Sequence, residues 1–354
     1  MDAIAQKNKD RDLSQNYFKA FLVIGMIFAH AIQLLTNVGG LGKYFSVYIN
    51  LITFSGFMFS FGYIYQAAYS TKEVSIMFAV SKMKTTLFAY FISAASWAVL
   101  IDHDATVYRM LSIALLINPS PYSEFLLAFF IMTGLYFGLR PVLTKLTLTG
   151  TNVIITCIIL LLLSSIHYGN YYPTIEIGGK KVFADYYIGL LLGSPRSSYF
   201  PILHYLIFFL MGLWFKKSGI RFSWIMLGIT MVGLFLLAAY RILFHEMPSR
   251  FPPSPFWIVG SFFFIYVYLL VSKTIKDNFL SRYLNLIGEN TIVYLVLSNV
   301  FLFALSTTGK YQTSAACGFA IAIILTTGFL VSSSRTFKPK TASPVMPAKA
   351  GTSV

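Results

Sequence analysis

The sequence predicts an all-α, polytopic integral membrane protein with about ten membrane-spanning helices. Hydrophobic residues make up 57% of the 354 residues and charged residues only 11%, whereas a soluble protein usually carries about 25% charged residues. Long apolar runs recur along the chain and are separated by short polar gaps that hold most of the Lys and Arg residues. So few charges cannot cover a water-facing surface of this size, and the apolar runs suit a bilayer.

Ten apolar segments are candidate spans. A helix needs roughly 20 residues to cross the hydrocarbon core, and shorter segments do so where the bilayer thins. We expect spans over residues 18–35, 45–68, 83–101, 122–139, 152–166, 199–215, 222–244, 256–271, 283–305 and 313–331. The apolar run 107–117 is about half the required length, so we expect it to lie in the interface or to re-enter the membrane. The transmembrane domain then covers residues 1–332, and the tail, 333–354, has the composition of a disordered cytoplasmic segment.

The placement of basic residues predicts the orientation of these spans. With the N-terminus inside, most Lys and Arg residues fall in cytoplasmic segments, and every such segment contributes. This follows the positive-inside rule and puts both termini in the cytoplasm. The net charge of +15 is scattered and forms no single basic face, so we expect membrane lipids and no nucleic acid as partners.

Ionisable side chains inside apolar runs are the first candidates for a functional site, because a charge in the bilayer core costs at least ~2.5 kcal/mol. His30 lies eleven residues after Lys19 in the first span, which is about 16 Å farther along a helix. An imidazole can take a proton from a hydroxyl and return it near neutral pH, so His30 is a candidate catalytic base. The alternative is a structural histidine bonded to a neighbouring helix.

Basic residues also gather at the cytoplasmic end of the third span. Lys82 and Lys84, together with Lys19, can form a pocket for a phosphate-bearing ligand. Topology-setting charge explains Lys82 and Lys84 about equally well, and Lys19 alone can extend to the headgroups. On the outer side, Glu124 and Arg241 lie deep enough to need a partner or water, which makes them candidates for binding sugar hydroxyls.

Two outer segments have alternative interpretations. Asp102, His103 and Asp104 can hold a metal in principle, but three adjacent side chains at a helix end point in different directions, so a solvated turn is favoured and no metal is expected. The longest outer loop, 168–198, is polar and aromatic. It suits either a glycan-binding loop or a solvated connector.

Several short motifs occur in a fixed order along the spans. The first span has Asn16, Lys19 and His30, where a known family has Asp, Arg and His at the same spacing. Residues 57–63 read Phe-Met-Phe-Ser-Phe-Gly-Tyr, and residues 82–90 read Lys-Met-Lys-Thr-Thr-Leu-Phe-Ala-Tyr. Residues 124–127 read Glu-Phe-Leu-Leu, and residues 287–295 read Ile-Gly-Glu-Asn-Thr-Ile-Val-Tyr-Leu. In this order they resemble the motifs of the acyltransferase family 3 membrane proteins.

The sequence departs from the pattern of that family at several of these positions. Lys19 keeps the charge of the usual Arg but not its bidentate geometry, and Asn16 removes the charge of the usual Asp. Phe61 replaces a Ser, and Leu297 stands where the family often has a His.

The resemblance implies a function and assigns roles to residues. Members of the family move acyl groups, mostly acetyl, from cytoplasmic coenzyme A donors to sugar hydroxyls on the other side of the membrane. By this resemblance His30 and Lys19 are catalytic, and Lys82, Lys84 and Tyr90 contact acetyl-CoA. Tyr294, Glu124 and Arg241 are the candidates for substrate binding.

The same resemblance suggests a location, a substrate class and the alternatives to be tested. The expected location is the bacterial inner membrane, and the expected acceptor is a surface polysaccharide, lipopolysaccharide or lipid-linked sugar. An envelope glycan flippase or polymerase, which needs no thioester, and a structural membrane partner without turnover are the alternatives.

Overall fold

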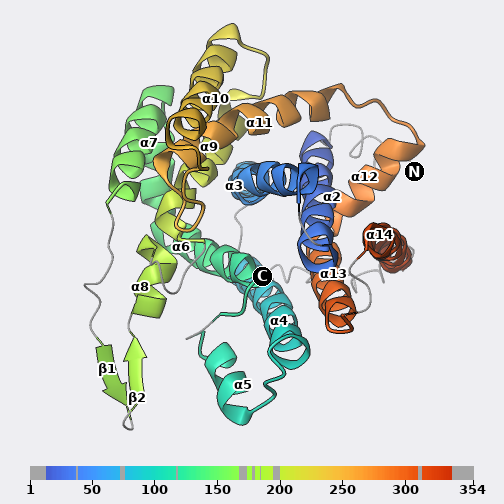
Figure 1. Ribbon diagram of the computed structural model, residues 1–354. Helices are drawn as coiled ribbons and strands as arrows, with labels where there is room; N and C mark the ends of the chain where they lie inside the picture. Colours follow the sequence, from blue (N-terminus) through green and yellow to red (C-terminus); the bar gives the residue numbers. More distant parts are fainter. Residues whose placement is uncertain are drawn as a thin grey trace, which may run out of the picture.

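The chain folds into a bundle of helices of unequal length (Figure 1). The computed structural model describes residues 13–36, 39–71, 76–116, 119–166, 174–177, 180–183, 185–193, 200–309 and 313–336. The first half contains α2 (Ser14–Leu35), α3 (Leu41–Thr71), α4 (Ile76–Leu100), α5 (Val107–Ala114), α6 (Glu124–Leu146) and α7 (Gly150–Ser164). The second half contains α8 (Asp185–Leu192), α9 (Ile202–Ser218), α10 (Trp224–Phe244), α11 (Pro255–Thr274), α12 (Phe279–Glu289), α13 (Thr291–Ser306) and α14 (Ser314–Thr336).

A single β hairpin interrupts the helical order within these ranges. Strands β1 (Thr174–Ile177) and β2 (Lys180–Phe183) pair antiparallel, with Ile177 opposite Lys180. The hairpin and α8 belong to the long loop for which a glycan-binding role was considered. The remainder of that loop, including Tyr171 and Arg196, lies outside the described residues.

Each of the ten predicted spans falls on a helix or, in one case, on a pair of helices. Seven helices of the described chain are long and apolar enough to cross a membrane, namely α2, α3, α4, α6, α10, α11 and α14. The pair α12 and α13 adds an eighth if it counts as one span, although its two halves are bent by 79°. α7 and α9 have only 15 and 17 residues. The multi-pass helical class is confirmed, whereas the count of ten is not.

Apolar side chains cover the outward faces of the peripheral helices, as expected of a protein in lipid. α10 packs on α11, and it exposes Ile225, Phe235 and Ile242 by 75%, 63% and 70%. α7 similarly exposes Ile155 and Leu162 by 52% and 65%. Exposure of this kind is unfavourable in water but costs nothing against acyl chains, so these faces are read as lipid contacts.

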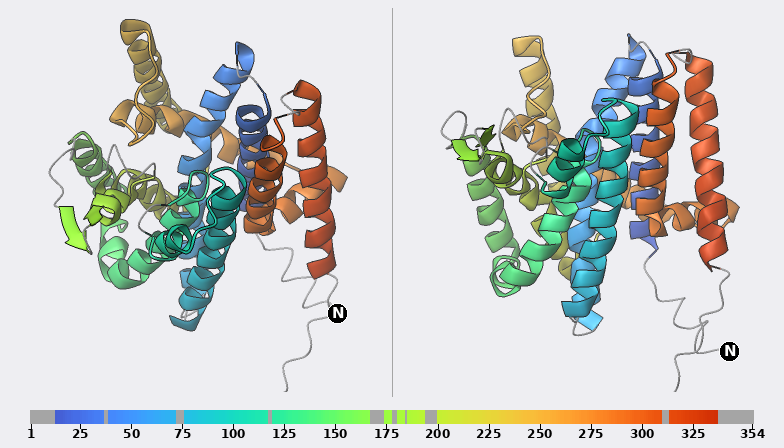
Figure 2. Two further views of the ribbon diagram at one scale, coloured as in Figure 1. Left: turned by 60° about the horizontal axis from the view of Figure 1, so that its bottom comes forward. Right: turned by 90° about the horizontal axis from the view of Figure 1, so that it is seen from below.

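α2 occupies the centre of the bundle and packs against α3, α11, α12, α13 and α14. Two further views show α2 and α14 running side by side (Figure 2). Lys19, near the start of α2, and Val331, near the end of α14, line the same pocket. The first and last described helices therefore begin and end on one side of the bundle. α14 continues to Thr336, so the first residues of the predicted tail are helical, and residues 337–354 lie outside the description.

Glycines bring the central helices into close contact. A Cβ atom at Gly288 would collide with the backbone of Asn16, and one at Gly62 would collide with the backbone of Phe209. The first contact sets α12 against the start of α2, and the second sets α3 against α9. Both glycines lie in the motifs noted above, so these motifs have a packing role whatever their part in function.

Candidate active site

The two ionisable residues of the first span lie on one face of α2. Eleven residues correspond to just over three turns of a helix, so His30 projects in nearly the same direction as Lys19, about 16 Å farther along the axis. The Lys19 side chain is half-buried, and His30 is only 8% exposed. α2 therefore presents a cation at one end and an imidazole at the other to the interior of the bundle.

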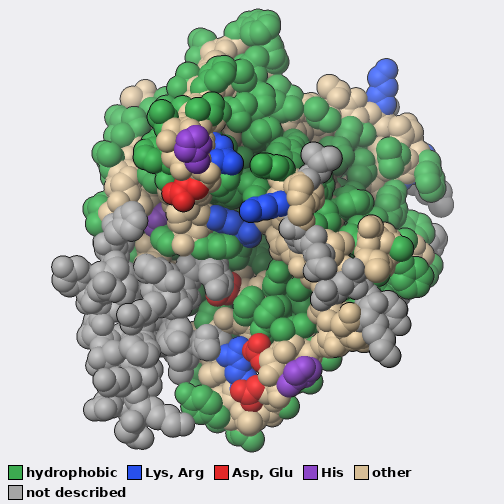
Figure 3. Space-filling view, in the orientation of Figure 1, with side chains coloured by type: hydrophobic (Ala, Val, Ile, Leu, Met, Phe, Trp, Pro, Cys, Tyr) green, Lys and Arg blue, Asp and Glu red, His purple; other side chains and the backbone are tan. Residues whose placement is uncertain are grey.

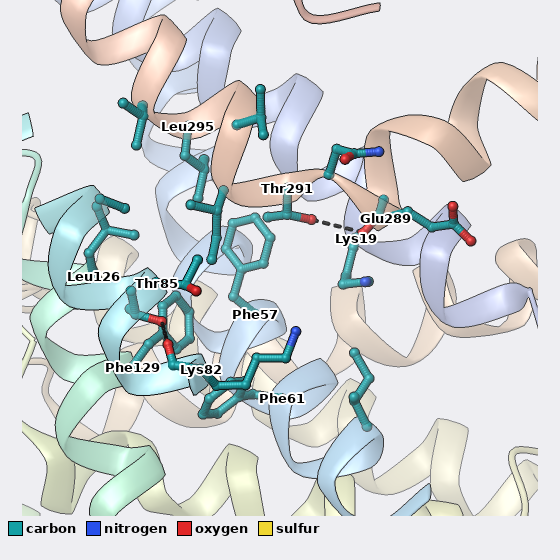
Figure 4. A pocket seen from close by; sticks show the side chains of 18 of the residues that line it. Lys19, Phe57, Phe61, Lys82, Thr85, Leu126, Phe129, Glu289, Thr291 and Leu295 are labelled. Atoms are coloured by element: carbon teal, nitrogen blue, oxygen red, sulfur yellow. Dashed lines mark hydrogen bonds between the residues drawn. The ribbon is translucent and has the colours of Figure 1, made fainter. Parts of the chain in front are cut away.

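The Lys19 end of this face opens into a cavity of about 800 Å³. We call it the lysine pocket. Its charged and polar lining includes Lys19, Lys82, Glu289, Thr85, Thr86, Asn290 and Thr291, and its apolar lining includes Phe57, Phe61, Ile92, Phe129, Val296 and Val300. Figure 4 shows the side chains of Lys19 and Lys82 reaching into the same part of the pocket from different helices. The pocket is mostly apolar, and its charged lining consists of two cations and the carboxylate of Glu289. The excess of one positive charge suits an amphiphilic anion.

Two further polar features belong to the pocket lining, the N-terminus of α13 and the hydroxyl of Ser60, whereas Gln15, which contacts Ser60, does not. The first residues of α13, including Thr291, Ile292 and Val293, line the pocket, so the partial positive charge of this helix N-terminus faces it. The hydroxyl of Ser60, also in the lining, donates to Gln15 Oε1 at 3.3 Å. The Nε2 of Gln15 is buried without a hydrogen-bond partner.

At the other end of α2, His30 lies in a compact polar region. The imidazole makes an edge-to-face contact with the ring of Tyr122, with centroids 4.6 Å apart. Asn299 lies beside it, yet neither His30 Nδ1 nor Asn299 Oδ1 has a partner with good hydrogen-bond geometry. His30 therefore faces protein and not lipid, and one of its ring nitrogens is available for a ligand.

Hydrogen bonds hold the neighbours of His30 in place. Asn299 Nδ2 donates to Ser93 Oγ at 2.7 Å and to the carbonyl of Tyr122 at 3.0 Å. The hydroxyl of Tyr122 donates to Gln33 Oε1 at 3.2 Å, and Gln33 Nε2 donates to Ser46 Oγ at 2.5 Å. These residues come from α2, α3, α4 and α13 and from the residues before α6. We call His30, Gln33, Ser46, Ser93, Tyr122 and Asn299 the His30 cluster.

The lysine pocket and the His30 cluster follow one another along the same helices. Ile92 and Val300 line the pocket, and the next residue of α4 and the preceding residue of α13 are Ser93 and Asn299 of the cluster. From Lys82 to Ile92 the lining of α4 extends over ten residues, or about 15 Å. The pocket thus extends from its cations toward the cluster. His30 itself is not part of the pocket lining.

The structure separates the residues predicted to bind the donor. Lys82 and Lys84 are both exposed, but only Lys82 belongs to the pocket lining. Tyr90 is fully buried, and its hydroxyl points to the carbonyl of Ile113 in α5 at 3.5 Å. Of the three, only Lys82 therefore accompanies Lys19 in the pocket.

The residues predicted to bind the substrate are spread over three places. Glu124 is buried at the start of α6, where its charge acts on Tyr90. Arg241 is half-buried in the last turn of α10. Tyr294 is fully buried with its ring against Gly328 of α14. None of Glu124, Arg241 and Tyr294 belongs to the pocket lining or to the His30 cluster, and their proposed roles stay predictions.

The outer Asp-His-Asp sequence forms a turn between α4 and α5. Asp102 pairs with Arg109 at 3.3 Å and accepts a hydrogen bond from the indole of Trp97 at 2.9 Å. Asp104 accepts from the amide and the hydroxyl of Thr106, at 3.0 and 2.6 Å, and these bonds lower the pKa of its carboxyl below the ordinary value of 3.8. Within the described residues, no group of three potential metal ligands occurs. The two carboxylates serve to shape the turn.

Sequence reasoning missed most of the His30 cluster. Ser93 and Asn299 are small polar residues inside apolar runs, and their position in the bilayer was a signal that the search for charged residues did not use. Gln15 lies just before the predicted first span and gave no such signal, whereas Gln33 lies inside that span near its end. On the side of the molecule shown in Figure 3, Lys and Arg side chains border a hollow near the middle of the face.

Comparisons of the chain with known protein families, with curated proteins and with solved structures found no match.

Proposed function

We propose that this protein is a membrane O-acyltransferase that moves an acyl group, most simply acetyl, from cytoplasmic acyl-CoA to a sugar hydroxyl on the other side of the bilayer. One observation carries the proposal. A cation-lined pocket and a buried imidazole with an unpaired nitrogen occupy the same face of one central helix, about 16 Å apart. Such an arrangement suits a donor and an acceptor that enter from opposite sides.

The lysine pocket is the proposed donor site. Coenzyme A carries several phosphates on a long, thin arm that ends in the thioester. Lys19, Lys82 and the N-terminus of α13 supply positive charge for the phosphates. The remainder of the pocket, about 15 Å along α4, gives the arm a path toward the His30 cluster.

His30 is the proposed general base. The nitrogen that lacks a partner accepts the proton of the sugar hydroxyl while the oxygen attacks the thioester carbonyl. The carbon–sulfur bond then breaks, and the proton passes to the departing thiolate. The products are an O-acyl sugar and free coenzyme A, so atoms and charges balance. Asn299 and Tyr122 hold the ring in position for this transfer.

The test measures release of free coenzyme A thiol by the purified full-length protein in lipid nanodiscs, with acetyl-CoA as donor and a sugar acceptor. We expect release to depend on the acceptor and to fall by at least about a hundredfold in His30→Ala, the range lost with a general base. His245→Asn is the matched control, because His245 is exposed and Asn tolerates its left-handed backbone. Wild-type release by His30→Ala would refute the catalytic assignment.

The same assay separates the proposal from its main rival. A flippase or glycan polymerase of the same envelope pathway consumes no thioester, so it releases no thiol. Mass spectrometry of surface glycan from a deletion strain gives an independent answer. Loss of one acyl mass from the glycan supports the transferase, whereas loss of the glycan itself supports the flippase or polymerase.

A further inference from the structure

Arg250 lies in a rigid connector between α10 and α11. The hydroxyl of Ser249 donates to the carbonyl of Pro252 at 3.0 Å, and the amide of Ser254 donates to the carbonyl of Ser249 at 2.9 Å. The ring of Phe251 packs edge-to-face on Phe200, with centroids 5.4 Å apart. The Arg250 guanidinium stacks 4.1 Å from the centre of the Phe251 ring. The connector thus holds the arginine in a fixed place.

The charge of Arg250 lacks an ionic partner within the described chain. The ion pairs found there join Arg109 to Asp102 and Arg282 to Asp277. Arg250 is half-buried, and burial lowers its pKa from 12.5 to about 10. A partly desolvated cation with no counter-ion is unfavourable, and an anion that binds it relieves this cost.

The position of Arg250 relates it to the His30 cluster. Its charge acts electrostatically on His30 and Tyr122, and on Tyr205 of α9. The cluster itself is neutral and rich in hydroxyl and amide groups, and two of its buried atoms, His30 Nδ1 and Asn299 Oδ1, are without partners. The region therefore offers one guanidinium for an anion and two unpaired atoms, His30 Nδ1 and Asn299 Oδ1, for hydroxyls.

We infer that Arg250 and the His30 cluster form a binding site for an anionic sugar. The guanidinium binds a carboxylate or phosphate of the sugar through two parallel hydrogen bonds, and the cluster binds its hydroxyls. The inference rests on the proposed function only in naming this sugar as the acceptor. Binding itself needs no donor, so it can be tested whether or not the protein transfers acyl groups.

The experiment is equilibrium binding to the full-length protein in nanodiscs, without any donor. The probes are glucuronic acid, glucose 1-phosphate and glucose, which distinguish a carboxylate from a phosphate and both from a neutral sugar. We expect at least one anionic probe to bind about tenfold or more tightly than glucose, the value of one charge-assisted hydrogen bond. Raising the salt concentration should weaken that preference.

Three variants complete the test. Arg250→Gln should reduce the affinity for the preferred anion to that for glucose, and Arg250→Lys should retain part of it. Arg282→Gln removes the same charge from an exposed site and should leave binding unchanged. The inference fails if neither anion binds the wild-type protein better than glucose, or if Arg250→Gln binds the anion as well as the wild-type protein. If Arg250→Gln does not fold, the wild-type preference and the Arg250→Lys affinity decide the outcome.

Discussion

The two ends of α2 have opposite physical characters. The lysine pocket is wide, with mostly apolar walls and its charges at one end. The His30 cluster is compact and neutral, and its amides and hydroxyls bind one another at 2.5–3.2 Å. A site of the first kind binds a long ligand by removing apolar surface from water and by contacts with a few charged groups. A site of the second kind positions a small polar group closely.

The contrast teaches where specificity resides. In the pocket most contacts are non-directional, so the length and chemistry of the ligand's arm can vary. In the cluster nearly every polar group is already used, and the two unpaired atoms, His30 Nδ1 and Asn299 Oδ1, are the groups that we propose bind a ligand. Variants at one end of α2 test whether the lysine pocket can be changed without the His30 cluster, and the reverse. The largest effect is expected from Gly288 and the smallest from Asp104.

Gly288→Ala should disrupt the lysine pocket most strongly. The added methyl group collides with the backbone of Asn16, so α12 must move away from the start of α2, which carries Lys19. Overpacking of this kind costs roughly 1–3 kcal/mol or more, and we expect the upper end of this range because the obstacle is backbone. Thermal unfolding in detergent measures the loss. Gly138→Ala, with open space around the new methyl group, should be neutral or slightly stabilising.

Asn299→Leu should damage the His30 cluster while leaving the pocket intact. The variant keeps a similar volume but removes the donors to Ser93 and to the carbonyl of Tyr122. Stability should fall by about 1–3 kcal/mol, the cost of unpaired buried polar groups. Acetyl-CoA affinity should not change. Asn50→Leu, which loses one long bond to Ser46 at 3.4 Å, should have a smaller effect on stability. Equal losses would contradict the ranking.

Lys82→Gln should weaken binding of acetyl-CoA about tenfold with little effect on stability, as one charge-assisted bond is lost. Lys84→Gln tests the sequence prediction against the structure, because Lys84 is exposed and lies outside the pocket lining. We expect its effect to be clearly smaller. Isothermal titration measures both affinities, and Lys276→Gln, in the connector before α12, provides the control. A larger loss in Lys84→Gln would show that the donor binds elsewhere.

The smallest effect should be the contribution of Asp104, in the turn between α4 and α5, to the pH dependence of folding stability. Thr106 lowers the pKa of Asp104 in the folded protein below 3.8. Ionised Asp104 therefore stabilises the fold at pH values above 3.8, and this contribution disappears as the pH falls through the lowered value. The difference in stability between wild type and Asp104→Asn should be small at neutral pH and vanish in acid. A difference independent of pH would exclude the carboxylate as its source.

The sequence predicted the helices well because hydropathy is a local property. Each of the ten expected segments coincides with a helix or with the pair α12 and α13. The bend at Asn290 was not foreseen, because residues 283–305 were interpreted as one span although Glu289, Asn290 and Thr291 interrupt its apolar residues. The bend also depends on how α12 packs against α2.

The candidate site was predicted only in part. Lys19 and His30 stood out as ionisable residues in an apolar run, and Lys82 stood out as a basic residue at the end of one. The structure brings Lys19 and Lys82 together in one pocket. Asn299 and Arg250 did not stand out, because their importance depends on neighbours hundreds of residues or several helices away. Spacing along one helix is readable from the sequence, whereas contact between helices is not.

The unequal lengths of the helices have a consequence for the surrounding bilayer. α7, with 15 residues, extends about 22 Å, while α14, with 23 residues, extends about 34 Å. Both present apolar side chains outward. A helix as short as α7 can cross the bilayer only where the hydrocarbon layer, about 30 Å thick elsewhere, becomes thinner. For a span at α7, we therefore expect lipids with short chains to gather along that edge of the protein.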